Sequence, residues 1–207
     1  MSARIEHLAT AGNHDPGGPP VHENNVWLIG DDAEVIVIDP AHDAPAVAAA
    51  VGGRRVVQVL LTHGHWDHVR AAVAFGALVG APVLLHPADA FLWEESHPRV
   101  GFVPVADGDV YEVAGVALEA RHTPGHTPGS TSYVAAELGA VFSGDTLFEG
   151  GPGATRWDYS DFGQIIGSIR GGLLTLPAAT VVHTGHGPST SIGAEAPSLG
   201  DWIARGW

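Results

Sequence analysis

The chain has 207 residues with 9 basic and 23 acidic side chains, so its formal net charge is −14 with histidine counted as neutral. Because it contains no lysine, it lacks the clustered cations that bind nucleic acid or anionic membrane surfaces, and we exclude both as partners. Its 45% hydrophobic and 15% charged residues are untypical of disordered chains, and the absence of cysteine excludes disulfides, thiolate nucleophiles and cysteine-ligated metals.

The first half of the chain predicts strands that alternate with helices. Continuous apolar runs between turn residues indicate buried strands, and an alanine-rich segment behind a capping aspartate indicates a helix. In chain order we predict a hairpin of strands over 26–29 and 35–38, a helix over 43–51, a strand over 56–61, a helix over 69–79, a strand over 83–85 and a short helix over 87–93.

The second half changes to short strands separated by glycine-bearing turns. We predict strands over 110–113, 116–121, 130–135 and 140–143, a helix over 161–174, a strand over 180–183 and a closing helix over 195–205. No low-complexity linker divides the chain, which predicts one domain over 1–207. Strands grouped in two halves with helices between and after them favour an α/β fold with two sheets packed face to face.

The chain shows no pattern of a targeting signal. Its first thirty residues are charged and rich in glycine and proline instead of basic and then apolar, and no later apolar run is long enough to cross a bilayer. We therefore expect a cytoplasmic protein.

Histidine is unusually frequent, with 13 residues, and three of them share one short segment with an aspartate. Directly after a predicted buried strand, residues 62–68 read Thr-His-Gly-His-Trp-Asp-His. In an extended segment alternate side chains point the same way, so His63 and His65 can reach one ion while Asp67 and His68, past a turn, face another. A single histidine is more often an ordinary surface or hydrogen-bonded residue, but this density favours a metal site.

Three further segments each combine a strand end with a glycine-rich loop that carries one ligand-type residue. They read Thr-Pro-Gly-His-Thr-Pro-Gly over 123–129 with His126, Ser-Gly-Asp-Thr over 143–146 with Asp145, and Thr-Gly-His-Gly-Pro over 184–188 with His186. Glycine lets the backbone turn sharply and approach the ligand closely. The main alternative to His126 is His122, four residues earlier, and we expect ordinary roles for His7, His14, His22, His42, His86, His97 and His183.

In motif type, order and spacing, the chain resembles the metallo-β-lactamase superfamily over residues 24–193. The resemblance implies a four-layer αββα sandwich of two mixed sheets with helices outside. The ligands it implies are His63, His65 and His126 for one divalent ion, Asp67, His68 and His186 for a second, and Asp145 as the bridge between them. It also implies that Asp39 supports the site from behind without binding metal. All-nitrogen and oxygen ligation suits zinc, and iron or manganese is also compatible.

Two cations that share a water lower its pKa and supply a hydroxide nucleophile, so the implied chemistry is hydrolysis. Asp67 is the candidate that orients this hydroxide and takes its proton, while Asp145 holds both ions. The motifs look most like the short glyoxalase II-like (hydroxyacylglutathione hydrolase-like) thioesterases, which act on S-acyl derivatives of a small thiol. The substrate is thus expected to be a small-molecule thioester. Glutathione and mycothiol both remain open as the carrier thiol.

The stretch Arg156-Trp157-Asp158-Tyr159 resembles the Arg-x-Asp-Phe segment of the shorter members of that group. We predict that Arg156, Trp157 and Tyr159 contact the substrate. The alternative is that Trp157 and Tyr159 cover the core while Arg156 pairs with Asp158.

Other functions compatible with these ligands are a lactonase, a persulfide dioxygenase with one iron, and a metal-binding domain without turnover. The complete second ligand set argues against the dioxygenase. A β-lactamase is a weaker alternative, since the motifs look like the hydrolase branch. The sequence also leaves a homodimer open.

Overall fold

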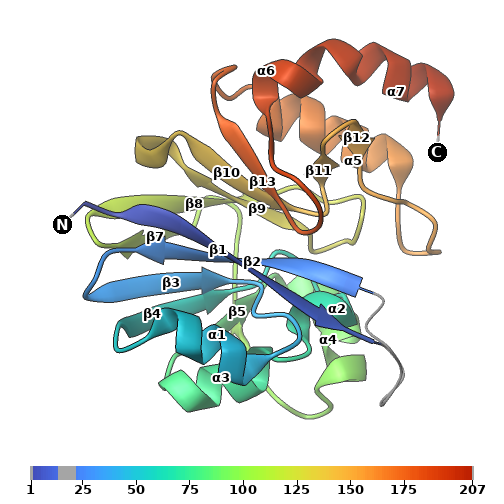
Figure 1. Ribbon diagram of the computed structural model, residues 1–207. Coiled ribbons are helices and arrows are strands. Elements are labelled where there is room, and N and C mark those ends of the chain that lie inside the picture. Colours follow the sequence, from blue (N-terminus) through green and yellow to red (C-terminus); the bar gives the residue numbers. More distant parts are fainter. Residues whose placement is uncertain (1, 14–21, 207) are drawn as a thin grey trace.

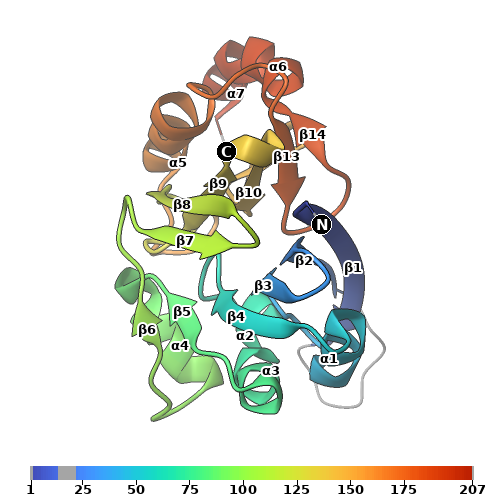
Figure 2. The same ribbon diagram turned by 90° about the vertical axis from the view of Figure 1, so that its left-hand side faces the viewer.

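The computed structural model describes residues 2–13 and 22–206. Figure 1 shows two sheets lying face to face, with helices on both outer sides. Figure 2 shows the first sheet with α1, α3 and α4 in the lower half of the molecule and the second sheet with α5, α6 and α7 in the upper half. The predicted four-layer αββα sandwich is confirmed.

The first sheet has the strand order β1-β2-β3-β4-β5-β6 within the described residues. β1, β2 and β3 pair antiparallel, and β3, β4, β5 and β6 pair parallel. The bounds are β1 Arg4–Gly12, β2 His22–Gly30, β3 Glu34–Ile38, β4 Arg55–Leu60, β5 Val83–Leu85 and β6 Val103–Pro104. The sequence did not predict β1 and β6, because both are edge strands and carry few buried apolar side chains.

The second sheet has the order β14-β13-β10-β9-β8-β7 over the same described ranges, and β13 pairs parallel to β10. Its bounds are β7 Val110–Val113, β8 Val116–His122, β9 Thr131–Ala135, β10 Ala140–Gly144, β13 Val181–Thr184 and β14 Thr190–Ser191. A small separate ribbon pairs β11 Leu147–Phe148 with β12 Gly151–Pro152. The predicted strands of this half are all present, with ends shifted by at most one residue.

The helices of the first half cover the outer face of the first sheet (Figure 1). They are α1 Ala44–Val51, α2 Trp66–Val69, α3 Ala72–Val79, a 3-10 turn Pro87–Asp89 and α4 Ala90–Ser96. Asp43 caps α1 by accepting a hydrogen bond from the Ala46 amide at 2.9 Å. The predicted helix over 69–79 is interrupted, because the Ala71 amide donates to the Ala41 carbonyl instead of continuing the helix.

The helices of the second half cover the other sheet. They are α5 Phe162–Ser168, which continues as a π-helical turn over Ile169–Leu173, then α6 Ile192–Glu195, a 3-10 turn Ala196–Ser198 and α7 Leu199–Arg205. The predicted helix over 195–205 is therefore two helices joined by a tighter turn that contains Pro197, which cannot donate a backbone hydrogen bond. No helix in the described part of the chain is both long and apolar enough to span a membrane.

The core explains why the central strands are continuous apolar runs. In β2, Trp27 and Ile29 face the second sheet, while Val26 and Leu28 pack against the helix side together with residues of α1 and α3. Each of these side chains is at most 7% exposed, so both faces of the strand are covered. The ends of β4, β8, β10 and β13 lead into the loops that carry the candidate ligands, and β3 ends directly before Asp39.

Candidate metal centre

The loop after β4 and the loop between β8 and β9 bring three imidazoles together. His63 Nε2 and His126 Nε2 each lie 3.0 Å from His65 Nδ1. His63 is 1% exposed and His126 is 3% exposed, so both rings are held inside the protein. We call His63, His65 and His126 the first cluster.

A second cluster lies beside the first and consists of Asp67, His68 and His186. His186 Nε2 lies 3.3 Å from Asp67 Oδ2 and 3.2 Å from His68 Nε2. Asp67 and His68 belong to α2, which begins at Trp66, and His186 follows β13. The start of this helix turns Asp67 and His68 away from the preceding extended residues, as the spacing of the motif predicts.

Asp145 lies between the two clusters. Its Oδ2 is 3.6 Å from His126 Nε2 and 3.5 Å from His186 Nε2, and its Oδ1 is 3.5 Å from His68 Nε2. Within the described ranges, Oδ1 is buried and has no hydrogen-bond partner. A buried carboxylate oxygen without a donor is costly unless a cation binds it. The structure thus places Asp145 where one carboxylate faces both clusters.

Two glycines allow this close packing. A Cβ atom on Gly185 would lie 2.2 Å from Asp145 Oδ1, and one on Gly144 would lie 2.4 Å from Thr62 Oγ1. Gly144 also has a φ of +50°, which L-residues rarely adopt. The glycines of these motifs therefore keep space next to the ligand atoms.

Each clustered imidazole has a partner on its other ring nitrogen. Such partners fix the ring orientation and leave the facing nitrogen free to bind a metal. In the first cluster, His63 Nδ1 donates to Thr62 Oγ1 at 3.1 Å, and His126 Nδ1 donates to the Ala154 carbonyl at 2.7 Å. In the second cluster, His68 Nδ1 donates to Asp39 Oδ2 at 3.0 Å, and His186 Nδ1 donates to the Glu23 carbonyl at 2.7 Å. His65 differs, because its Nδ1 faces the cluster and its Nε2 lies 2.9 Å from the Tyr159 hydroxyl.

Asp39 lies behind the clusters, where the resemblance to the superfamily implies a supporting acidic residue. Besides its bond from His68, its carboxylate accepts hydrogen bonds from the Thr62 amide at 2.8 Å and from Thr62 Oγ1 at 2.6 Å. It is 1% exposed and has a φ of +49°. A non-glycine residue in this region is held there by its surroundings, and here three donors fix it.

The sequence analysis missed two supporting aspects of the site. Asn24 donates to Asp67 Oδ2 at 3.2 Å, and His42 Nε2 donates to Asn24 Oδ1 at 2.7 Å, so His42 is more than an ordinary histidine. Asp89 accepts from the Gly64 amide and from Thr127 Oγ1, and so connects the loops of both motifs. Its position behind β5, at the same sheet edge as the ligand loops, is the signal that could have found it.

The first cluster is prepared to bind a cation. Burial lowers the pKa of all three imidazoles, and for His65, where the nearby His126 adds to the effect, the pKa falls to about 3. These rings are neutral near pH 7, which is the form that binds metals.

The second cluster holds charge instead. Burial alone would lower the pKa of His186, but Asp145 and Asp67 outweigh it and raise the pKa to about 11. Burial would raise the pKa of Asp67 and of Asp145, but His68 and His186 outweigh it, so both pKa values are lowered and both groups are carboxylates. A divalent cation would take the place of the proton among these carboxylates.

The donor set fits two divalent metal ions. Imidazole nitrogens and carboxylate oxygens bind zinc, iron and manganese, and the ligand atoms of each cluster lie within 4.8 Å of one another. The unpartnered Asp145 oxygen supports the same conclusion.

The other histidines that the structure describes lie outside both clusters. The competing candidate His122 donates from Nε2 to the Pro128 carbonyl at 2.8 Å and stacks on His86. His183 is half-buried and packs against Trp27 and Phe142. His14 lies outside the described residues.

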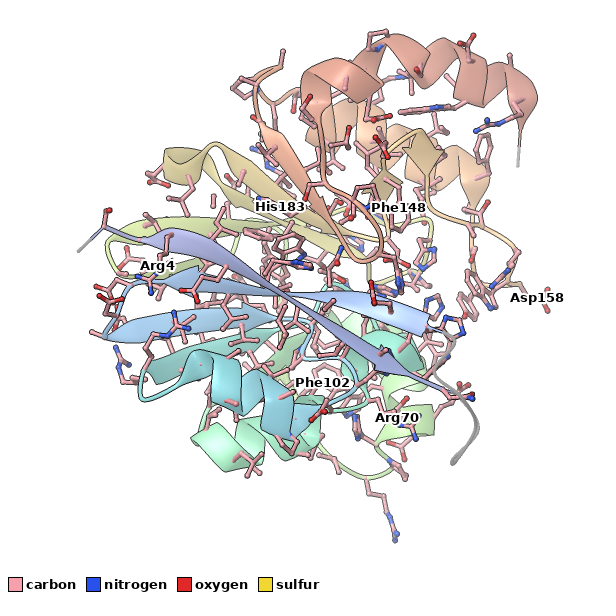
Figure 3. The ribbon with its side chains drawn as sticks, in the orientation of Figure 1. Arg4, Arg70, Phe102, Phe148, Asp158 and His183 are labelled. Carbon is pink, nitrogen blue, oxygen red and sulfur yellow. The ribbon has the colours of Figure 1, made fainter. Side chains whose placement is uncertain are left out.

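Both clusters open into one pocket of about 780 Å³. Phe148, from the upper half of the molecule in Figure 3, and Arg70, from the lower half, both line this pocket. Trp66 also lines it, at the rim, with the Arg70 guanidinium 5.9 Å from its ring.

The loop after β12 forms one wall of the pocket. Arg156, Trp157 and Tyr159 all line it, and the Trp157 ring lies 4.6 Å from His65. Arg156 stacks on Trp157 at 4.8 Å, and within the described residues it forms no ion pair with Asp158. Burial, with smaller effects of Glu95 and Asp89, raises the pKa of Tyr159 to about 12, so its hydroxyl is protonated. These side chains therefore border the clusters instead of covering the core.

Known families and structures match this arrangement. The family model of the Metallo-beta-lactamase superfamily matches residues 19–186. The chain belongs to this superfamily. The hydroxyacylglutathione hydrolase GloC of Haemophilus influenzae is 34% identical over 193 residues, which cover 85% of this chain and 91% of the relative.

Two solved structures of the metallo-beta-lactamase fold are also similar. TTHA1623, described in a di-iron-bound form, is 30% identical with a TM-score of 0.77, covering 91% of this chain and 96% of that one. The BLEG-1 B3 metallo-beta-lactamase is 28% identical with a TM-score of 0.76, covering 94% and 97%. Membership of the superfamily and the two His and Asp clusters together support a metallo-hydrolase with a dinuclear site.

Proposed function

We propose that the chain is a thioesterase that hydrolyses S-acyl derivatives of a small thiol. The observation that carries the proposal is Asp145, whose carboxylate faces two complete ligand clusters at 3.5–3.6 Å. The similarity to a relative named hydroxyacylglutathione hydrolase supports the substrate class. A metal-binding domain without turnover would have no need of the large pocket onto which both clusters open.

In the proposed reaction, different residues of this pocket would have different roles. Two divalent ions held by the clusters would supply an activated water and an electrophilic centre for the acyl oxygen. Asp67 is our candidate for the group that takes the proton from the attacking water, since its carboxylate lines the pocket and Asn24 fixes its Oδ2. Asp145 would hold both ions at a fixed separation.

Arg156 and Trp157 would bind the part of the substrate that extends from the reacting centre. Arg156 is exposed, and its guanidinium lies on Trp157 at the pocket wall, where a carboxylate of the acyl group or of the thiol can reach it. Arg156→Ala is expected to raise KM for an anionic thioester about tenfold, the usual loss of one charged contact, without changing metal content. An unchanged KM would remove Arg156 from the binding site.

We propose zinc as the native metal, with iron as the alternative because a similar structure is described in a di-iron form. A mononuclear-iron persulfide dioxygenase would need only one ion, whereas the second cluster here retains Asp67, His68 and His186 in contact distance. Metal analysis of the purified protein distinguishes a hydrolase with two ions per chain from a dioxygenase with one. One iron ion per chain and no hydrolysis would favour the dioxygenase.

A matched pair of variants tests the centre. His126→Ala should abolish hydrolysis and lower the metal content, because it removes a ligand of the first cluster. His122→Ala changes a histidine four residues away that bonds to Pro128, and should retain both metal and activity. Equal metal loss in the two variants would contradict the assignment.

The substrate panel should contain S-lactoylglutathione, an acyl-mycothiol, a homoserine lactone and a β-lactam. Preferential cleavage of the thioesters supports the proposal. Cleavage of the lactone or the β-lactam alone would overturn it and leave the metal centre as assigned.

A further inference from the structure

Tyr159 contacts the first cluster through its hydroxyl. The hydroxyl oxygen lies 2.9 Å from His65 Nε2, and this is its one hydrogen bond within residues 2–13 and 22–206. The same side chain lines the pocket together with Asp67, Asp145 and His186. The phenol therefore lies at the boundary between a cluster imidazole and the space for substrate.

The direction of this hydrogen bond follows from the His65 ring. Its Nδ1 faces His63 Nε2 and His126 Nε2 at 3.0 Å, so Nδ1 is the nitrogen that offers a lone pair to the cluster. A neutral imidazole then carries its proton on Nε2, which donates to the Tyr159 oxygen. A hydroxyl that accepts this bond keeps its own proton available for a different acceptor.

Neighbouring rings hold the phenol in place. Trp157 stacks on Tyr159 with an interplanar angle of 6° and a centroid distance of 6.1 Å. Phe91 contacts the same ring edge-on at 5.2 Å, and Trp157 in turn lies on His65. A donor fixed in this way needs little reorganisation during a reaction.

We propose that Tyr159 is a further catalytic residue, whose hydroxyl donates a hydrogen bond to the acyl oxygen of the thioester as that oxygen gains negative charge. The proposal rests on the proposed thioesterase function. The segment that 156–159 resembles ends in phenylalanine, so the hydroxyl is an addition of this chain and not part of that pattern.

Tyr159→Phe tests the hydroxyl alone, because the ring and its stacking are retained. We expect kcat on S-lactoylglutathione to fall about 10- to 100-fold, as for loss of one donor to a developing oxyanion, with metal content unchanged. Tyr111→Phe is the matched control, since it removes a hydroxyl that bonds to Asp109 outside the pocket. It should leave kcat unchanged.

A binding measurement provides a second readout that does not depend on turnover. One inert analogue of S-lactoylglutathione replaces the sulfur with methylene and keeps the carbonyl, and the other replaces the carbonyl with methylene. The first analogue is a ketone. Measured by calorimetry, the affinity for this ketone should fall about tenfold in Tyr159→Phe, which corresponds to the loss of one hydrogen bond. The affinity for the analogue without a carbonyl should stay unchanged.

Other outcomes would overturn the proposal. An unchanged kcat and equal effects on both analogues would show that the hydroxyl makes no contact with the acyl oxygen. A loss of activity that added zinc restores would show that Tyr159 only positions His65. If the wild-type protein hydrolyses no thioester, the proposed function fails, and this result is separate from any effect of the variant.

Discussion

Asp89 connects the two loops of the first cluster, and its removal should destabilise the fold and this cluster together. The carboxylate is fully buried and accepts hydrogen bonds from the Gly64 amide at 2.8 Å, the Gly129 amide at 2.6 Å and Thr127 Oγ1 at 2.7 Å. Asp89→Ala leaves three buried donors without a partner, at about 1–3 kcal/mol each. Because burial raises the pKa of Asp89, the loss of a buried charge offsets part of this cost. We expect the free energy of unfolding to fall by about 3 kcal/mol or more.

Urea denaturation of the metal-loaded protein measures this change, with metal analysis on the same samples. Asp89→Asn keeps one acceptor oxygen, so its free energy of unfolding should fall less, by about 1–3 kcal/mol. The control is Asp43→Asn at the exposed cap of α1, where asparagine caps as well as aspartate and stability should change by less than about 0.5 kcal/mol. If Asp89→Ala stays within about 1 kcal/mol of the wild type and retains both ions, the carboxylate does not hold these loops.

Three further predictions concern the metals. Gly185→Ala places a methyl group 2.2 Å from Asp145 Oδ1, so metal analysis should find at least one ion per chain fewer than in the wild type. Gly53→Ala has open space around the new methyl group and should retain both ions. In the metal-free protein, His186 has a pKa of about 11 and is protonated at pH 7.5, so metal binding should release a proton and the apparent affinity should rise with pH. Calorimetry in buffers of different ionisation enthalpy counts that proton. A binding enthalpy that does not depend on the buffer would refute the assignment of His186 as a ligand that is protonated before metal binds. Chelation should lower the unfolding temperature, since a ligand at 100 times its Kd stabilises the folded state by about 2.7 kcal/mol; equal melting curves would contradict a site that forms only on folding.

The sequence determined the fold class and the candidate ligands because both are encoded locally. Residues 62–68 place several ligand-type side chains on one short segment, and any fold that ends a buried strand there must present them together. Continuous apolar runs marked the central strands in the same way. Edge strands such as β1 were missed, because a half-exposed strand has no comparable pattern.

The tertiary structure alone decided how the site is held. The hydrogen-bond partner of His65 Nε2 is Tyr159, which lies 94 residues away, and the partner of Asp67 Oδ2 is Asn24, at a distance of 43 residues. Asp89 likewise contacts both ligand loops only because β5 ends at the same sheet edge. Hydrogen bonds between residues so far apart depend on how strands and loops pack in the folded chain, and no local pattern of residue types encodes their geometry.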